Sequence, residues 1–211
     1  DVAPSRGLGD VYKRQGYQVV AFTKGQEAID YIGNKVDLWI LDIMLGDDVN
    51  GYDVIKAIRE QDENVPVIFT SARDQDLDKI LGLELGSDDY ITKPYSSKEL
   101  VLRVDKIIKR VYKNTSKQLI TYEDYTIDID RRVVLGKDKK EIKLTTLEFD
   151  LLLLFVQNRN KCFSREEILN AVWGKDYFGT DRVVDDLVRR LRKKVSGLNV
   201  NAVYGYGYRL S

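Results

Sequence analysis

Three residues have the side chains needed to accept and hold a phosphoryl group. Asp42, Ser71 and Lys93 each follow a short apolar run. A carboxylate that accepts a phosphoryl group needs a hydroxyl and a cation to hold the phosphoryl oxygens, and Mg²⁺ to offset the charge. Taken singly, each residue reads as an ordinary surface residue, or in the case of Asp42 as the cap of a strand. In this order, after three such runs, they predict one phosphoryl-accepting site.

The apolar runs themselves predict buried parallel strands. They cover residues 38–41, 67–70 and 90–91. A short unbroken apolar run is typical of a strand buried on both faces; a buried helix segment looks similar, but these runs are shorter than most helices. Because ligands collect at the carboxyl ends of parallel strands, we expect the three side chains to converge there.

Helical periodicity separates these strands. The predicted helices of the first half cover residues 26–32, 52–61, a segment from Leu77 to Leu85 that Gly86 closes, and 97–111. A further strand is predicted at residues 17–22. Strands that alternate with helices predict an α/β fold with a parallel sheet.

The pattern changes after residues 113–118, which are polar and read as a linker. Residues 120–129 and 132–144 alternate as short antiparallel strands do, and residues 203–210 predict a terminal hairpin. Helices are predicted at 147–157, 164–173 and 182–195, the second of them opened by a Ser164–Glu167 capping box. Three helices with terminal strands predict a winged helix-turn-helix.

The charge distribution also divides the chain. Residues 1–117 hold 17 Lys and Arg against 20 Asp and Glu, a net charge of −3, whereas residues 118–211 hold 17 against 14, a net charge of +3. An acidic half before a basic half suggests two domains with different partners.

Several classes of chemistry are excluded by composition. The 211 residues contain no histidine and one cysteine, Cys162. This excludes a histidine base, a histidine metal site, a structural zinc site and an intramolecular disulfide. The lone cysteine, the lack of a long apolar run and the lack of a signal-peptide core lead us to expect a cytoplasmic protein with no membrane segment.

Residues 16–112 resemble the receiver domain of bacterial two-component response regulators, which has the flavodoxin-like fold. The resemblance lies in residues 36–45 (VDLWILDIML), 50–52 (NGY), 66–73 (PVIFTSAR) and 86–95 (GSDDYITKPY). It implies that Asp42 accepts the phosphoryl group from a sensor histidine kinase, with Ser71 and Tyr90 as switch residues and Lys93 on the phosphate. It also implies a cis Lys93–Pro94 peptide bond.

The resemblance further implies a metal site and a pairing face. Mg²⁺ would be held by Asp42, by the backbone carbonyl of Met44 and by an acidic pair at the end of the first strand. Receivers would pair as homodimers on activation through salt bridges on the last helix–strand–helix face. The residues that match this face are Lys79, Asp89, Glu99 and Arg103.

Residues 1–15 depart from the family pattern. They contain no apolar strand run and no acidic pair, since Asp10 stands alone. We interpret them as an atypical N-terminal segment, either a foreign or misread replacement of the first strand or the mark of a degenerate receiver, and favour replacement. We therefore expect Mg²⁺ binding by this chain to be weak or absent.

The predicted helix at 182–195 carries a basic face. Val184, Val188, Leu191 and Val195 form one buried stripe, and the basic residues lie off it. Such a helix could lie on a membrane surface or simply be solvated. The preceding helix and the terminal hairpin favour major-groove recognition of double-stranded DNA.

Residues 118–211 resemble the effector domain of OmpR/PhoB-type response regulators. The matching stretches are 144–149 (LTTLEF), 164–169 (SREEIL), 172–174 (VWG), 189–194 (RRLRKK) and 205–209 (GYGYR). The implied DNA-binding residues are Arg182, Leu187, Arg189, Arg190, Arg192, Lys193 and Tyr204. Among these, Leu187 and Arg190 would face bases, and Arg182, Arg189 and Arg192 would contact phosphates. Residues 174–180 would contact RNA polymerase, whereas Trp173, Phe149 and Leu151 would be core.

The wing also departs from the pattern, because Tyr204 stands where the family often has an arginine for the minor groove and Ala202 where it has a threonine. We therefore expect the helix at 182–195 to carry more of the DNA affinity.

Three hypotheses follow. The first is a non-enzymatic transcriptional regulator that phosphorylation of Asp42 controls, with a receiver at 16–112, a linker at 113–118 and a winged-helix domain at 119–211 that reads tandem half-sites. The second is a DNA-binding regulator that works without phosphorylation. The third is a dehalogenase-like phosphatase, which Met44 argues against because that chemistry usually needs an aspartate at this position.

Overall fold

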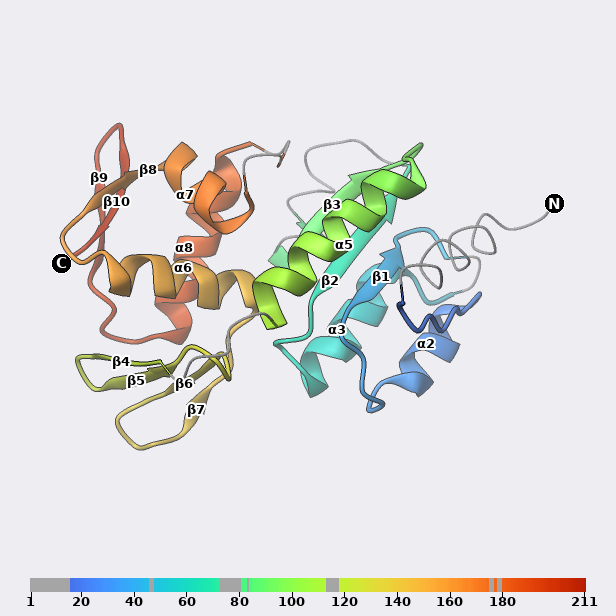
Figure 1. The fold of residues 1–211 in the computed structure, drawn as a ribbon, viewed down its shortest axis with the longest axis horizontal. Helices are drawn as coiled ribbons and strands as arrows, with labels where there is room; N and C mark the ends of the chain where they lie inside the picture. Colours follow the sequence, from blue (N-terminus) through green and yellow to red (C-terminus); the bar gives the residue numbers. More distant parts are fainter. Residues whose placement is uncertain are drawn as a thin grey trace.

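The computed structural model describes residues 16–45, 48–72, 81–82, 84–112, 118–174, 177 and 180–211. Two bodies lie side by side: a parallel sheet with its helices, and a C-terminal body of helices between two antiparallel sheets (Figure 1). Helix α5 (Ser97–Tyr112) lies where the two bodies meet. The predictions for residues 1–15, for Lys79 and for much of the segments 77–85 and 113–118 lie outside the described residues.

The first body confirms the predicted alternation of strands and helices. Its other elements are α2 (Gly25–Tyr31), β1 (Trp39–Asp42), α3 (Gly51–Gln61), β2 (Val67–Ser71) and β3 (Asp89–Thr92). The three strands are parallel in the order β1-β2-β3, with Asp42 opposite Thr70 and Ser71 opposite Thr92. Residues 81, 82 and 84 are helical, and Gly86 follows with φ of +89°, the left-handed conformation expected after a helix end.

Apolar side chains cover both faces of this sheet. On one face, Trp39, Leu41 and Phe69 pack against α2 and α3. On the other face, Ile68 and Ile91 pack against the buried side of α5. The sheet is thus a middle layer, and its carboxyl edge remains open for polar residues.

The predicted strand at residues 17–22 is wrong, because these residues form no strand. Their apolar side chains pack instead of pairing: Tyr17 and Val19 join the cluster beneath α5, and the Tyr17 hydroxyl donates to Asp105. The Phe22 ring lies 6.4 Å from the Trp39 ring. An alternating pattern of apolar and polar residues indicates only that one face of the segment is buried. Here the apolar side chains are buried against helix α5 and against the Trp39 ring, without pairing to a neighbouring strand.

The C-terminal body has the predicted winged-helix order. Its elements are β4 (Leu119–Tyr122), β5 (Tyr125–Asp128), β6 (Val133–Leu135), β7 (Glu141–Ile142), α6 (Thr146–Gln157), β8 (Cys162–Ser164), α7 (Arg165–Val172), α8 (Arg182–Lys194), β9 (Val200–Val203) and β10 (Gly207–Leu210). The first four strands form one antiparallel sheet, and β8-β10-β9 form the other. Strand β8 was not predicted; it has three residues, too few for a clear period.

One apolar cluster holds the C-terminal body together. The predicted stripe of α8 is confirmed, with Val184, Val188, Leu191 and Val195 each at most 1% exposed. Trp173, Phe149 and Leu151 are core residues, also as predicted. The capping box at Ser164 and Glu167 begins α7 as predicted, and Thr145 and Glu148 form a second one at α6.

Candidate functional site

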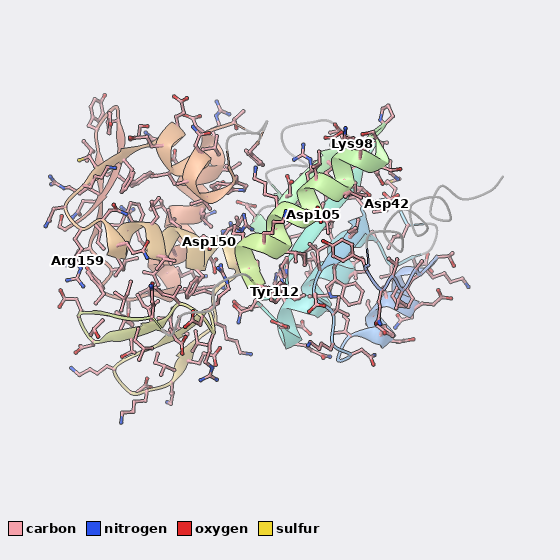
Figure 2. All side chains as sticks on the ribbon, viewed as in Figure 1. Asp42, Lys98, Asp105, Tyr112, Asp150 and Arg159 are labelled. Atoms are coloured by element: carbon pink, nitrogen blue, oxygen red, sulfur yellow. The ribbon has the colours of Figure 1, made fainter. Side chains whose placement is uncertain are left out.

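Asp42 and Lys93 meet at the carboxyl edge of the parallel sheet. Asp42 ends β1, and the Lys93 ammonium group forms an ion pair with Asp42 Oδ2. The other carboxylate oxygen, Oδ1, accepts a hydrogen bond from the Met44 backbone N–H at 3.1 Å. The Asp42 side chain is 29% exposed and lies at the open end of β1 (Figure 2). A carboxylate in this position can be reached by a reactant from solvent.

The strand register places Ser71, but not Tyr90, at the same edge, because Ser71 pairs with Thr92 whereas Tyr90 pairs with Phe69 further back along the strands. Ser71 ends β2 and is fully buried, and its carbonyl accepts from the Lys93 N–H at 2.7 Å. The cis peptide bond at Lys93–Pro94 is present as predicted. Tyr90 is 7% exposed in the core with Phe69, so in this structure its ring lies inward.

Gly51 allows the turn after β1 to fold back onto Asp42. A Cβ atom at this position would lie 2.4 Å from the Asp42 carbonyl oxygen, which no side chain could tolerate. Asn50 then caps α3, because its side chain accepts from the N–H groups of Tyr52 and Asp53. The residues at 50–52 thus shape the rim of the site.

The described residues on their own do not fit Mg²⁺. Near Asp42 they offer a single carboxylate and the carbonyl of Met44, and among them no group of three or more acidic or cysteine side chains lies close enough to hold a metal. Mg²⁺ takes six oxygen ligands in near-octahedral geometry. The acidic pair that the family carries is missing from residues 1–15, and these residues lie outside the described part of the chain.

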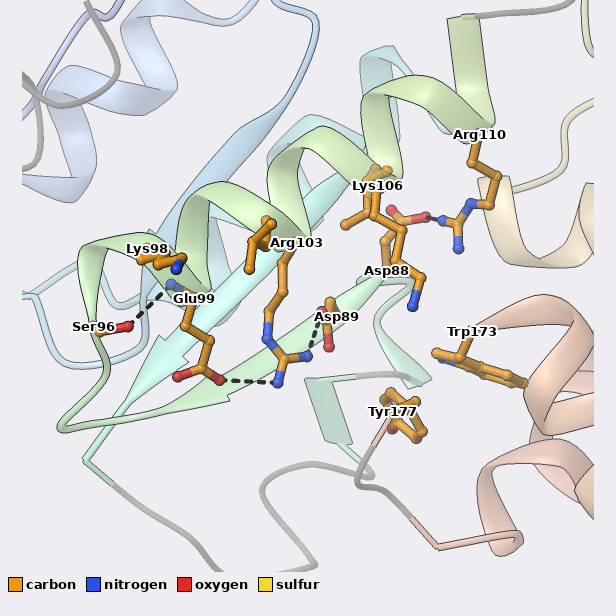
Figure 3. Close-up of a pocket in the computed structure, with 12 residues that line it drawn as sticks. Asp88, Asp89, Ser96, Lys98, Glu99, Arg103, Lys106, Arg110, Trp173 and Tyr177 are labelled. Carbon is orange, nitrogen blue, oxygen red and sulfur yellow. Dashed lines mark hydrogen bonds and ion pairs between the residues drawn. The ribbon is translucent and has the colours of Figure 1, made fainter. Parts of the chain in front are cut away.

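The predicted pairing face carries an ion-pair chain on α5 and β3 (Figure 3). Arg103 lies 2.9 Å from Asp89 Oδ2 and 3.1 Å from Glu99 Oε1. Burial lowers the pKa of Arg103, but the two carboxylates outweigh it, so that the net shift is upward. These contacts lie within one chain; whether the same residues join two receivers stays a prediction.

Some of the predicted DNA-binding residues on helix α8 are exposed and others are buried. Arg182, Arg189, Arg192 and Lys193 lie on its exposed side. Leu187 is 0% exposed and belongs to the apolar core, so the prediction that it faces bases is wrong. Its position one turn from Val184 and Leu191 places it on the stripe that the same periodicity identified.

Arg190 is also more enclosed than predicted. Its side chain is 15% exposed and lies 4.0 Å from Glu148, and burial lowers its pKa. Glu148 is itself buried and contacts Lys194 at 2.9 Å. In this structure, Arg190 therefore faces a carboxylate of its own domain.

The wing is anchored from α8. Arg192 Nε donates to the Val200 carbonyl at 3.0 Å, which ties the helix to β9, so Arg192 has a structural contact besides its predicted phosphate contact. Tyr204 is fully exposed between β9 and β10, in the position expected of a wing tip. Tyr206 donates to Glu167, which fixes the wing on α7.

A buried ionic network was missed by sequence reasoning. Arg110 of α5 contacts Asp88 Oδ1 at 2.9 Å and Asp150 Oδ2 at 3.1 Å, and it donates to the Val172 carbonyl. Asp88 also lies 3.9 Å from Arg59. Figure 2 shows Asp150 beside the end of α5. The only sequence signal was the Asp88–Asp89 doublet, because these contacts join residues far apart in the chain.

A parallel sheet with a carboxylate and a lysine paired at its carboxyl edge, followed by a winged-helix body with a basic helix, defines a class of protein: a two-domain regulator with a signal receiver and a DNA-binding output. Two family descriptions match the chain accordingly. "Response regulator receiver domain" matches residues 2–105, and "Transcriptional regulatory protein, C terminal" matches residues 139–210.

The chain belongs to the OmpR/PhoB-type two-component response regulators. It is 51% identical over 201 residues to the transcriptional regulatory protein CssR of Bacillus subtilis, covering 94% of this chain and 89% of CssR. Among solved structures, a RitR C128D mutant superposes with a TM-score of 0.74 at 26% identity, covering 98% and 93% of the two chains. DrrB, an OmpR/PhoB homolog of Thermotoga maritima, gives 0.50 at 28% identity with the same coverage.

No helix within the described ranges has the length and apolarity that a bilayer crossing requires.

Proposed function

We propose that a sensor histidine kinase controls this transcriptional regulator by phosphorylating Asp42. The observation that carries the proposal is the pairing of Asp42 with Lys93 at the carboxyl edge of the sheet, next to Ser71. A carboxylate at this edge is accessible, and a cation stands beside it to hold phosphoryl oxygens.

The transfer is a displacement at phosphorus. An Asp42 carboxylate oxygen forms a bond to the phosphorus of the kinase's phosphohistidine, and the P–N bond breaks with its electron pair left on the imidazole nitrogen. The Lys93 ammonium group moves from the carboxylate to the new phosphoryl group, whose charge is larger. Ser71 supplies a hydroxyl donor once its side chain turns toward that group.

The output is DNA binding by α8. Arg182, Arg189, Arg192 and Lys193 contact phosphates, Arg190 reads bases once it is uncovered, and Tyr204 touches the groove beside the wing. Receiver pairing through Asp89, Glu99, Arg103 and Lys79 places two heads on tandem half-sites, and residues 174–180 face RNA polymerase. The working boundaries are 16–112 and 119–211, with the linker between them. The regulator acts in the cytoplasm, where it can reach both the promoter DNA and the catalytic part of the kinase.

A second candidate is a regulator that binds DNA without phosphorylation. The observation that favours it is the single carboxylate at the edge, which leaves Mg²⁺ with few protein ligands among the described residues. Under this hypothesis the receiver serves only as an assembly module.

The two candidates differ in one measurement. The full chain is incubated with acetyl phosphate and Mg²⁺ and examined by intact-protein mass spectrometry, with Asp42→Asn and Lys93→Ala alongside. Phosphorylation control predicts one phosphoryl group on the wild type, none on Asp42→Asn and a slower gain on Lys93→Ala. An unmodified wild type would support the second candidate, and a phosphoryl group on Asp42→Asn would place the acceptor elsewhere.

A further inference from the structure

A cavity lies where helix α5 meets the C-terminal body. Its volume is about 330 Å³, and α5 lines one side of it while Trp173 and Tyr177 line the other (Figure 3). Pockets that bind small molecules typically measure roughly 300–1,000 Å³ and are common at domain interfaces. The cavity is therefore large enough to hold a small organic molecule.

The C-terminal body gives this cavity an aromatic wall. The centroids of the Trp173 and Tyr177 rings lie 5.6 Å apart, and the ring planes are tilted by 35°. Helix α5 adds the apolar side chains of Leu102, which is 59% exposed, and Ile107. Aromatic rings stack on one another with an offset and exclude water from the surface that they cover. The wall therefore suits a planar aromatic group.

Both aromatic side chains of the wall carry a hydrogen-bond donor that lacks an acceptor. The Trp173 indole N–H is buried and unpaired, and the Tyr177 hydroxyl makes no hydrogen bond within the described ranges. Burial, and then the charge of Asp89, raise the pKa of the Tyr177 hydroxyl, so this group keeps its proton at neutral pH and remains a donor. Enclosed donors without acceptors are costly. A ligand that carries oxygen acceptors would remove part of this cost.

The charged groups of the cavity favour an anion. Among the described residues, its lining includes three carboxylates and four cations, which are Lys98, Arg103, Lys106 and Arg110. Asp150, a further carboxylate on Arg110, is balanced by its own contact with Arg132. Lys106 is exposed, and its ammonium group lies so close to Gly174, the residue after Trp173, that a side chain at Gly174 would collide with it. A lysine thus stands beside the aromatic wall, where it can hold a carboxylate.

We propose that this cavity binds a planar aromatic carboxylate, with its ring on Trp173 and Tyr177 and its carboxylate at Lys106. The ring replaces water on the aromatic wall, and the carboxylate oxygens accept from the lysine and from the tyrosine hydroxyl. Because α5 belongs to the receiver and the two rings belong to the C-terminal body, one bound molecule contacts both bodies. The site gives the regulator a small-molecule input that does not involve Asp42.

The two tryptophans of the chain serve as reporters of binding. Naphthalene-2-carboxylate is titrated into the full, isotope-labelled chain, and the two indole N–H signals, assigned with Trp39→Phe, are followed by heteronuclear NMR. Trp39 is 8% exposed in the cluster that packs on α2 and α3, away from the cavity, so its signal is an internal control. We expect the Trp173 signal to shift and saturate with a dissociation constant between roughly 10 μM and 1 mM, and the Trp39 signal to stay in place.

A matched pair of variants tests the charge contact. Lys106→Gln and Lys109→Gln each remove one exposed lysine charge from α5, but only Lys106 lines the cavity. We expect Lys106→Gln to weaken binding of the carboxylate roughly fivefold, and Lys109→Gln to weaken it by less than about twofold.

The neutral analogue naphthalene-2-carboxamide tests the need for a negative charge. It has the same ring system, and we expect the wild type to bind it at least about fivefold more weakly than the carboxylate. Equal affinities for the two compounds, or an equal loss in the two lysine variants, would overturn the proposed site. So would equal shifts of both indole signals, or no shift of the Trp173 signal at about 5 mM carboxylate.

Discussion

The two halves of the molecule are held together in different ways. Among the described residues, the C-terminal body has one cluster of 24 buried apolar side chains that spans α6, α7, α8 and the strands. The described receiver has two smaller clusters, of 11 and 6 residues, on opposite faces of its sheet. Both bodies also enclose a charged group: Asp88 lies beside Arg59 and Arg110 in the receiver, and Glu148 lies beside Arg190 and Lys194 in the C-terminal body.

The different cores suggest different roles for the two bodies, one in keeping a fixed shape and the other in responding to a signal. A single apolar core gives the DNA-binding body one well-defined shape. Ionic contacts depend on charge and on precise partners, so they respond when a charged group is added nearby. We therefore expect a charge added to the receiver to act through the ionic contacts that connect it to the C-terminal body.

The largest effect is expected from an apolar truncation in the C-terminal core. Phe155 is 0% exposed and packs 6.2 Å from the Phe163 ring. We expect Phe155→Ala to lower the free energy of unfolding of this body by about 4 kcal/mol, because it removes buried contacts and leaves a cavity. Urea denaturation followed by tryptophan fluorescence measures the loss. A change below about 1 kcal/mol would mean that the core is not a single packed unit.

Truncation of a charged side chain tests how far the buried ionic network stabilises the receiver. Arg110→Ala leaves Asp88 fully buried with the Val67 N–H on its Oδ2 and, among the cations of the described ranges, only Arg59 near it, at 3.9 Å. We expect a loss of about 3 kcal/mol near neutral pH, since an uncompensated buried charge is costly. The measurement is urea denaturation as a function of pH.

The pH dependence of that variant has a definite sign. Burial raises the pKa of Asp88 above its ordinary value of 3.8, and Arg110 opposes this shift, so its removal raises the pKa further. A raised folded-state pKa gives stability at low pH that is lost as pH rises through that pKa. The deficit of Arg110→Ala should therefore shrink toward pH 4. A deficit that is independent of pH would show that Asp88 is not the cause.

Helix capping offers a smaller comparison with matched variants. Asn50 caps α3 in the receiver and Thr145 caps α6 in the C-terminal body, and both form capping boxes. Asn50→Ala and Thr145→Ala should each cost about 1 kcal/mol in urea denaturation. A much larger cost for Thr145→Ala would show that the adjoining contact between the two bodies, in which Thr146 Oγ1 donates to the Asn64 carbonyl, depends on it.

The sequence predicted most helices and strands whose apolar residues recur with a clear helical or strand period. Helix α8 shows this well, since the spacing of Val184, Val188 and Leu191 fixed its buried side. The same rule explains two failures. Residues 17–22 alternate but form no strand, since Tyr17 and Val19 pack in the cluster of α5 and Phe22 packs beside Trp39. Leu187 was predicted to contact bases although it belongs to the buried stripe.

One part of the candidate site, the meeting of residues at the ends of the strands, could also be predicted from the sequence. Strand ends meet at one edge of a parallel sheet, so the meeting of Asp42 with Lys93 followed from strand order. The contacts of Arg110 with Asp88 and Asp150, and of α8 with Glu63 and Glu84, depend on how two domains pack. No local period encodes such packing, because its partners lie far apart in the chain.

The central claim is that a phosphoryl group on Asp42 strengthens the hold of α8 on DNA. It is tested most directly by the affinity of the full chain for one duplex before and after acetyl phosphate treatment, with occupancy of Asp42 verified by mass spectrometry. We predict that the phosphorylated chain binds at least about fivefold more tightly and that Asp42→Asn shows no change. An unchanged affinity at full occupancy of Asp42 would contradict the account.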